Sequence, residues 1–195
     1  MNIPADAQAV LDFWFGAPGD ADHGSAREIW FRKSEATDRT ITQHFTALIE
    51  RALRGELAAW SVQPHSALAQ IVLLDQFTRN CFRDTPRAFA GDPQALAAAS
   101  AMVGTRQDEA LLPVQRGFVY LPFEHSESMA MQTESLRLFT RLAALAPSTA
   151  GLLDYAQKHH AVVARFGRFP HRNAQLGRHS TAEELAFLEQ PGSRF

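Results

Sequence analysis

Cysteine, lysine and long apolar segments are all scarce in this sequence of 195 residues. Cys81 is the single cysteine, which excludes an internal disulfide and a metal cluster built from several cysteines. No apolar run approaches the roughly 18 residues of a membrane span, and the first ten residues contain no Lys or Arg with which a signal peptide would begin. We therefore expect a cytoplasmic protein, because a reducing compartment fits the low cysteine content.

An excess of charge of one sign is also lacking, since 19 basic residues stand against 21 acidic ones and the formal net charge is -2. This balance supplies no overall field to hold the chain on nucleic acid or on an anionic membrane, so we expect neither partner. Lys33 and Lys158 are the two lysines, and all other basic residues are arginines. Arginine is preferred where a planar carboxylate or phosphate is bound through two hydrogen bonds, so the arginine positions are of interest.

Alternating β-branched residues are missing as well, whereas Ala and Leu recur at helical spacing, so the sequence predicts an all-α fold. There is no fixed-period repeat, low-complexity tract or Ser/Gly-rich linker, and we expect a single domain over residues 1–195. Turn signals divide this domain into about seven to nine helices. The clearest cover residues 5–15, 35–53, 64–80, 92–103, 123–144, 151–166 and 181–189, the last opened by a capping box of Ser180 and Glu183.

The predicted helix 64–80 is apolar on nearly every side, which is typical of a buried helix, yet it carries charge. Asp75 and Arg79 lie one turn apart and project from an apolar stripe in the direction of Leu68. Asn80 lies next to the direction of Leu73. Buried charges of this kind must be paired or must serve a ligand, because an isolated one would cost several kcal/mol.

Polar residues interrupt apolar faces at two further places. Glu124, His125 and Glu127 stand at the start of the predicted helix 123–144, with both carboxylates on its inward side. His159 shares one face of the predicted helix 151–166 with apolar residues. The loop that follows combines Gly, Pro and two aromatic residues with four polar ones, which are Arg168, His171, Arg172 and Asn173.

Four longer strings of residues stand out in the sequence. They are LDQFTRN (residues 74–80), TPRAF (85–89), PFEHSE (122–127) and FGRFPHRN (166–173). In them, and in VLDFWF (10–15), the chain resembles the bacterial domain of unknown function 924 over nearly its whole length. Thr78 is a departure, because that family usually has Pro there. The resemblance implies a tetratricopeptide-like fold of antiparallel helix pairs in a right-handed array. It implies no established activity.

If the four segments converge, their polar residues form one enclosed pocket, and the surplus of donors and acceptors suggests that a bound molecule completes the network. Glu124 and His125 are the candidate catalytic residues, because burial can move the pKa of such groups towards neutrality. The arginines favour an anionic ligand, a carboxylate or a phosphate ester. The candidate ligand-binding residues are Asp75, Arg79, Asn80, Glu127, His159, Arg168, His171, Arg172 and Asn173.

A metal site is a more specific hypothesis for the same pocket. His125, His159 and His171, together with a carboxylate, are acceptable ligands for zinc or manganese. No two of the candidates show the spacing of a recognised motif such as H-E-x-x-H, so the sequence assigns no metal and names no cofactor.

Three functions remain open on the sequence. The preferred one is a pocket for a small anionic molecule, with acid–base catalysis as an extension. The second is a module that binds a protein or peptide in a concave groove, as helical arrays of the resembled fold do, and it predicts exposed signature residues. The third is a purely structural network, which predicts that Asp75→Asn or Glu124→Gln lowers stability by a few kcal/mol.

Overall fold

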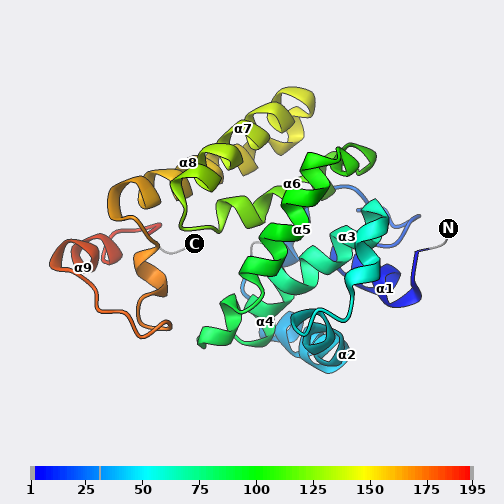
Figure 1. Ribbon diagram of the computed structural model, residues 1–195, viewed down its shortest axis with the longest axis horizontal. Helices are drawn as coiled ribbons and strands as arrows, with labels where there is room; N and C mark the ends of the chain where they lie inside the picture. Colours follow the sequence, from blue (N-terminus) through cyan, green and yellow to red (C-terminus); the bar gives the residue numbers. More distant parts are fainter. Residues whose placement is uncertain (1–2, 31, 194–195) are drawn as a thin grey trace.

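Helices make up all of the regular structure in the part of the chain that the computed structural model describes, residues 3–30 and 32–193 (Figure 1). The prediction of an all-α fold is confirmed. A π-helical segment, Val72–Phe77, connects α3 to α4, and short 3-10 turns form several other connections. The helices are α1 (Ala5–Phe15), α2 (Glu35–Leu53), α3 (Pro64–Ile71), α4 (Thr78–Cys81), α5 (Asp92–Gly104), α6 (Pro113–Glu124), α7 (Met129–Leu145), α8 (Ala150–Phe166) and α9 (Ala182–Leu188).

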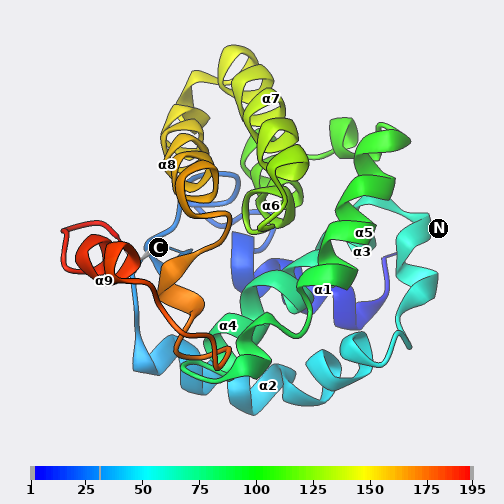
Figure 2. The same cartoon turned by 60° about the vertical axis from the view of Figure 1, so that its left-hand side comes forward.

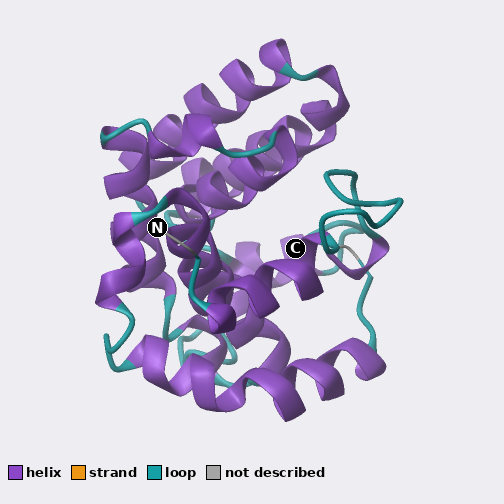
Figure 3. Ribbon diagram, turned by 90° about the vertical axis from the view of Figure 1, so that its right-hand side faces the viewer, coloured by secondary structure: helices purple, strands orange, loops and turns teal. Residues whose placement is uncertain are grey.

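The helices form two layers that share one apolar core. In Figure 2, α7 and α8 lie side by side above α6, and α1 to α5 form the lower part of the molecule. The turn Pro147–Thr149 joins α7 to α8 as an antiparallel pair, which is compatible with the tetratricopeptide-like arrangement. The segment between α8 and α9 is loop apart from the 3-10 turn Pro170–Arg172, and Figure 3 draws the described residues as helix and loop alone. Within the described ranges, none of the helices combines the length and apolar character needed to span a bilayer.

The continuous helical run from α3 through the π-helical segment to α4 is the centre of the lower layer. It follows the predicted helix 64–80 closely, and its apolar side chains, such as Leu68 and Ile71, are fully buried. Gly91, just before α5, packs directly on its backbone: a Cβ atom at Gly91 would lie 2.2 Å from the carbonyl oxygen of Leu74. The π-helical turn is wider than an α-helical one, and such turns are frequent at functional sites.

The prediction of one long helix over residues 123–144 is wrong. Instead, α6 ends at Glu124 and α7 begins at Met129. Pro122 lies inside α6, near its end. The Gln132 side chain stabilises the break because its Nε2 donates to the carbonyl oxygens of Glu124 (2.6 Å) and Ser126 (2.7 Å), which α6 leaves without helical partners.

The predicted capping box of α9 is displaced by one residue. Thr181 is the cap: its Oγ1 accepts from the backbone N–H of Glu184 at 3.1 Å, and the Glu184 carboxylate accepts from the backbone N–H of Thr181 at 2.7 Å. Ser180 has another partner, because its Oγ accepts a hydrogen bond from Nδ2 of Asn173 at 3.0 Å. The two possible boxes, Ser180 with Glu183 and Thr181 with Glu184, are equivalent in sequence, and tertiary contacts select the second.

Candidate functional site

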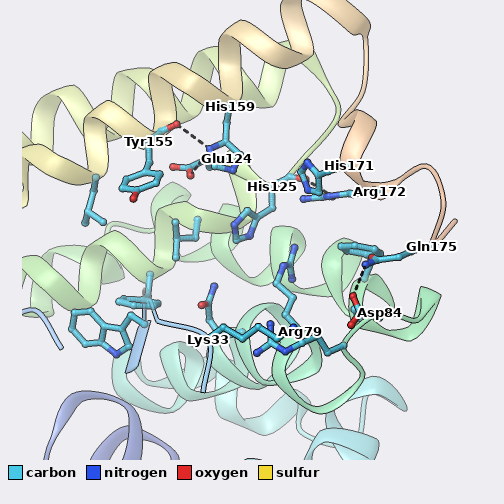
Figure 4. Close-up of a pocket in the computed structure, with 18 residues that line it drawn as sticks. Lys33, Arg79, Asp84, Glu124, His125, Tyr155, His159, His171, Arg172 and Gln175 are labelled. Carbon is cyan, nitrogen blue, oxygen red and sulfur yellow. Dashed lines mark hydrogen bonds and ion pairs between the residues drawn. The ribbon is translucent and has the colours of Figure 1, made fainter. Parts of the chain in front are cut away.

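A cavity of about 560 Å³ lies where the lower layer, the end of α6, α8 and the loop after α8 meet (Figure 4). Its described walls include Trp30, Phe89 and Phe118. The cavity reaches solvent, because Lys33 and Asp84 in its lining are exposed and Tyr155 is 44% exposed. The polar residues of the lining are Lys33, Gln76, Arg79, Arg83, Asp84, Glu124, His125, Tyr155, His159, His171, Arg172 and Gln175.

Asp75 and His125 form a largely buried polar pair beside this cavity. Asp75, which is 1% exposed, accepts from Nδ1 of His125 at 2.8 Å and from Nε2 of Gln76 at 2.6 Å. Burial alone would raise the pKa of Asp75, but the donor His125 and the guanidinium of Arg79 outweigh it and hold the pKa below its usual range. Burial lowers the pKa of His125, and Arg79 lowers it further against the opposing charge of Asp75. The imidazole is therefore neutral at neutral pH, with its proton on Nδ1.

Arg79 and Arg172 share one carboxylate. Nη1 of Arg79 lies 2.9 Å from Asp92 and 3.4 Å from Asp75, whereas Nη1 of Arg172 lies 3.4 Å from Asp92 and donates to the carbonyl oxygen of His125 at 3.0 Å. Both guanidinium groups lie over the ring of Phe89, at 5.7 Å for Arg79 and 4.8 Å for Arg172. Burial, followed by the nearby charge of Arg79, lowers the pKa of Arg172 to about 10. Two cations are thus held close together, and Arg172 has the longer contact with the carboxylate that they share.

Glu124 and His159 form a second pair, on the α8 side of the cavity (Figure 4). Nδ1 of His159 donates to the carbonyl oxygen of Tyr155 at 2.9 Å and lies 3.0 Å from Oε1 of Glu124. Glu124 is 2% exposed, and its Oε2 is buried with no hydrogen-bond partner in the described structure. The rings of His159 and His125 are 6.0 Å apart, so the two pairs adjoin.

His171 completes the histidine group of the cavity wall. Burial lowers its pKa to about 3, with a further contribution from the charge of Arg172. The imidazole is therefore neutral at physiological pH. His171 and Arg172 belong to the 3-10 turn Pro170–Arg172, which projects both side chains towards the cavity (Figure 4).

Three of the other predicted site residues lie in a separate cluster, which we call the C-terminal network. It consists of Glu127, Arg168, Asn173, Arg178, Ser180 and Glu184. Glu127 accepts from Arg178 at 2.7 and 2.9 Å and from the backbone N–H of Phe169 at 2.8 Å. Arg168 makes two hydrogen bonds to Glu184, at 2.6 and 2.8 Å. Asn173 accepts from Arg178 at 2.9 Å. These hydrogen bonds connect the loop after α8 to the turn before α7 and to α9. They thereby hold in place the loop segment that carries His171 and Arg172.

Asn80 also faces away from the cavity. Its Nδ2 donates to Asp38 of α2 at 2.8 Å, and Arg83 binds the same carboxylate at 2.7 and 2.9 Å. The expectation that all candidate residues meet in one pocket therefore fails for Asn80, Glu127, Arg168 and Asn173. The physical reason is that consecutive residues of a helix end or a tight loop point in different directions, so one motif serves two clusters.

The structure also places residues at the cavity that sequence reasoning did not select. Lys33, Tyr155 and Gln175 line it, and Gln175 reaches across its rim to Asp84 with a 3.4 Å hydrogen bond. Lys and Gln are ordinarily found at the surface, and neither Lys33 nor Gln175 lies within an apolar pattern. Tyr155 lies on the apolar face of α8 that also carries His159, where an aromatic side chain is typical of a core residue. The scarcity of lysine is a weak signal for Lys33.

The fold and site define an all-helical protein with an arginine- and histidine-lined cavity, open to solvent, between two helical layers. The family model for the bacterial protein of unknown function DUF924 matches residues 10–192, and the chain belongs to that family. The solved structure of a protein of unknown function from Agrobacterium tumefaciens is similar, with a TM-score of 0.83 and 38% sequence identity over 96% of this chain and 99% of that one. No curated protein matches the chain.

Proposed function

We propose that the cavity binds a small anionic molecule, a carboxylate or a phosphate ester, with Arg172 and Arg79 as its principal contacts. The observation that carries this proposal is the incomplete pairing of Arg172, which is 5% exposed and has one carboxylate contact, at 3.4 Å. Its Nε is buried with no hydrogen-bond partner among the residues described. A buried guanidinium normally has its donors paired, so an anion beside Arg172 would complete its hydrogen bonding and offset the repulsion from Arg79.

The charge and size of the cavity support the same ligand class. Four cationic side chains and two carboxylates belong to its described lining. A volume of about 560 Å³ falls within the range of roughly 300–1,000 Å³ that is usual for small-molecule sites. Asp75, Glu124 and Arg172 are each at least nine-tenths buried, which disfavours a concave groove that would present them to a peptide.

Acid–base chemistry is the extension that the residues support. With Nδ1 of His125 donating to Asp75, Nε2 carries the lone pair, and a neutral imidazole oriented by a carboxylate is a suitable general base. Glu124, one of whose buried oxygens has no hydrogen-bond partner among the described residues, is the accompanying carboxylate. We therefore assign any catalytic role to Glu124 and His125, and ligand orientation to the arginines.

Calorimetry tests the proposal. Thermal-shift screening with carboxylates and phosphate monoesters selects a ligand, whose affinity is then measured for the wild type, Arg172→Gln and Arg168→Gln. Loss of a charge-assisted hydrogen bond costs about 1.5–3 kcal/mol, so we expect Arg172→Gln to weaken binding about 10- to 100-fold. Arg168→Gln is the matched control, because Arg168 lies in the same loop but binds Glu184 outside the cavity. If no anion stabilises the wild type, or both variants bind equally well, the proposal is wrong.

A further inference from the structure

Glu124, His125 and His159 have the composition and proximity of a metal site. Each contributes one potential ligand atom, and these three atoms all lie within 4.8 Å of one another. A tetrahedral zinc ion with bonds of about 2.05 Å separates its ligand atoms by about 3.4 Å, so the longest separation would close by about 1.4 Å on binding. Changes in side-chain torsions can supply that movement, because the ligands come from two different helical segments, the end of α6 and the middle of α8.

The hydrogen bonds around both histidines are those of metal ligands. Nδ1 of His125 donates to the carboxylate of Asp75, and Nδ1 of His159 donates to the carbonyl oxygen of Tyr155. A metal-binding histidine almost always donates its other ring N–H to a carboxylate or a backbone carbonyl, which fixes the tautomer and the ring orientation. In both rings this leaves the lone pair on Nε2. The nitrogen of His159 nearest to Glu124 is Nδ1, 3.0 Å from Oε1, so binding through Nε2 would require the His159 ring to turn about its Cβ–Cγ bond.

Glu124 supplies the independent observation that points to a ligand. Its Oε2 is buried and has no hydrogen-bond partner in the described residues, although the side chain is 2% exposed. An unpaired buried carboxylate oxygen is costly, and a cation beside it would remove that cost. Gln132 fixes the position of this residue by donating to its backbone carbonyl oxygen at 2.6 Å.

We propose that Glu124, His125 and His159 bind one divalent transition-metal ion through a carboxylate oxygen and two imidazole nitrogens. Two histidines and one carboxylate suit Zn²⁺, Mn²⁺ or Fe²⁺ and leave coordination positions open. All three residues line the cavity, so the open positions face the space in which the anionic ligand is proposed. The site stands on its own ligand geometry and does not depend on anion binding, although an anion could occupy an open position. With an ion bound, the Nε2 lone pair of His125 would be a metal ligand, so metal binding is an alternative to the general-base role of His125.

Titration calorimetry of the chelator-treated protein with ZnCl₂ and MnCl₂, in a buffer free of phosphate and carboxylate, tests this site. We expect the wild type to bind one equivalent of at least one ion. Glu124→Gln and His159→Gln should each weaken that binding by 100-fold or more, because each removes a ligand. Asp75→Asn should weaken it 10- to 100-fold, because Asp75 orients His125 without touching the ion.

His44→Gln is the control, since His44 is an exposed histidine of α2 remote from the cavity lining. It should bind the ion as the wild type does. Circular dichroism establishes whether each variant is folded. If Glu124→Gln does not fold, the affinity of His159→Gln for the ion tests the proposal. Absence of one-equivalent binding by the wild type would overturn the proposal, as would unchanged binding in the folded ligand variants. Because no carboxylate or phosphate is present, failure here is distinct from failure of the proposed anion site.

Discussion

Two single substitutions, one at Asp75 and one at Glu124, distinguish a structural network from a functional site. A purely structural role predicts that Asp75→Asn and Glu124→Gln both destabilise the protein. The contacts predict different outcomes, because Asp75 is fully paired with His125, Gln76 and Arg79, whereas Oε2 of Glu124 has no hydrogen-bond partner among the described residues.

The magnitudes follow from these contacts. Removing one member of a well-paired buried ion pair costs about 3 kcal/mol, so Asp75→Asn should lower Tm by about 6–12 °C at 2–4 °C per kcal/mol for a chain of this size. Glu124→Gln replaces an incompletely paired buried carboxylate by a neutral group of the same shape. The free energy of unfolding of this variant should stay within about 1 kcal/mol of the wild-type value or exceed it. An increase is expected where a functional residue lowers the stability of the protein that carries it.

Urea denaturation followed by tryptophan fluorescence and circular dichroism measures both free energies. The titrations are made with a chelator and without anionic ligands, so that neither proposed ligand contributes stability. Equal losses of several kcal/mol in the two variants would refute the reasoning, because Glu124 would then be as fully integrated into the network as Asp75.

Two further predictions concern the packing of α5 and the C-terminal network. Gly91→Ala should destabilise the protein by about 2 kcal/mol or more in urea titrations, because its Cβ would meet the backbone of Leu74 at 2.2 Å. Gly104→Ala at the other end of α5, where a Cβ meets nothing within 4 Å, is the control and should be neutral or slightly stabilising; a loss equal to that of Gly91→Ala would contradict this packing. Hydrogen bonds from Arg168 and the backbone of Thr181 lower the pKa of Glu184 from 4.5 to about 2, so its contribution is present above pH 4.5 and is lost as the pH falls towards 2. The Tm difference between wild type and Glu184→Gln should therefore shrink over that range, and a constant difference would count against the pairing.

Most of the fold could be predicted because its helices carry strong local signals. The predicted boundaries of 5–15 and 35–53 coincide with α1 and α2, since Gly16 has φ of 82° and Ser34 caps the start of α2. The break between α6 and α7 could not be predicted in this way. It depends on Gln132 reaching back to the carbonyl oxygens of Glu124 and Ser126, a contact that periodicity does not contain.

The site was partly predictable, because a charged residue on an otherwise apolar helix indicates either a partner or a ligand. That reasoning selected Asp75, Arg79 and His159, and the fold places these residues at or beside the cavity although they come from distant segments. It could not separate Arg172, which lines the cavity, from Arg168, which binds Glu184, because side-chain direction in a loop has no regular period.

The central claim is that Arg172 and Arg79 bind an acidic molecule within the cavity. A crystal structure of the protein with the anion that gives the largest thermal shift measures this most directly. We expect density for the carboxylate or phosphate group within about 3 Å of the Arg172 guanidinium, between the ring of Phe89 and His125. An anion bound elsewhere on the protein, with only ordered water beside Arg172, would contradict it.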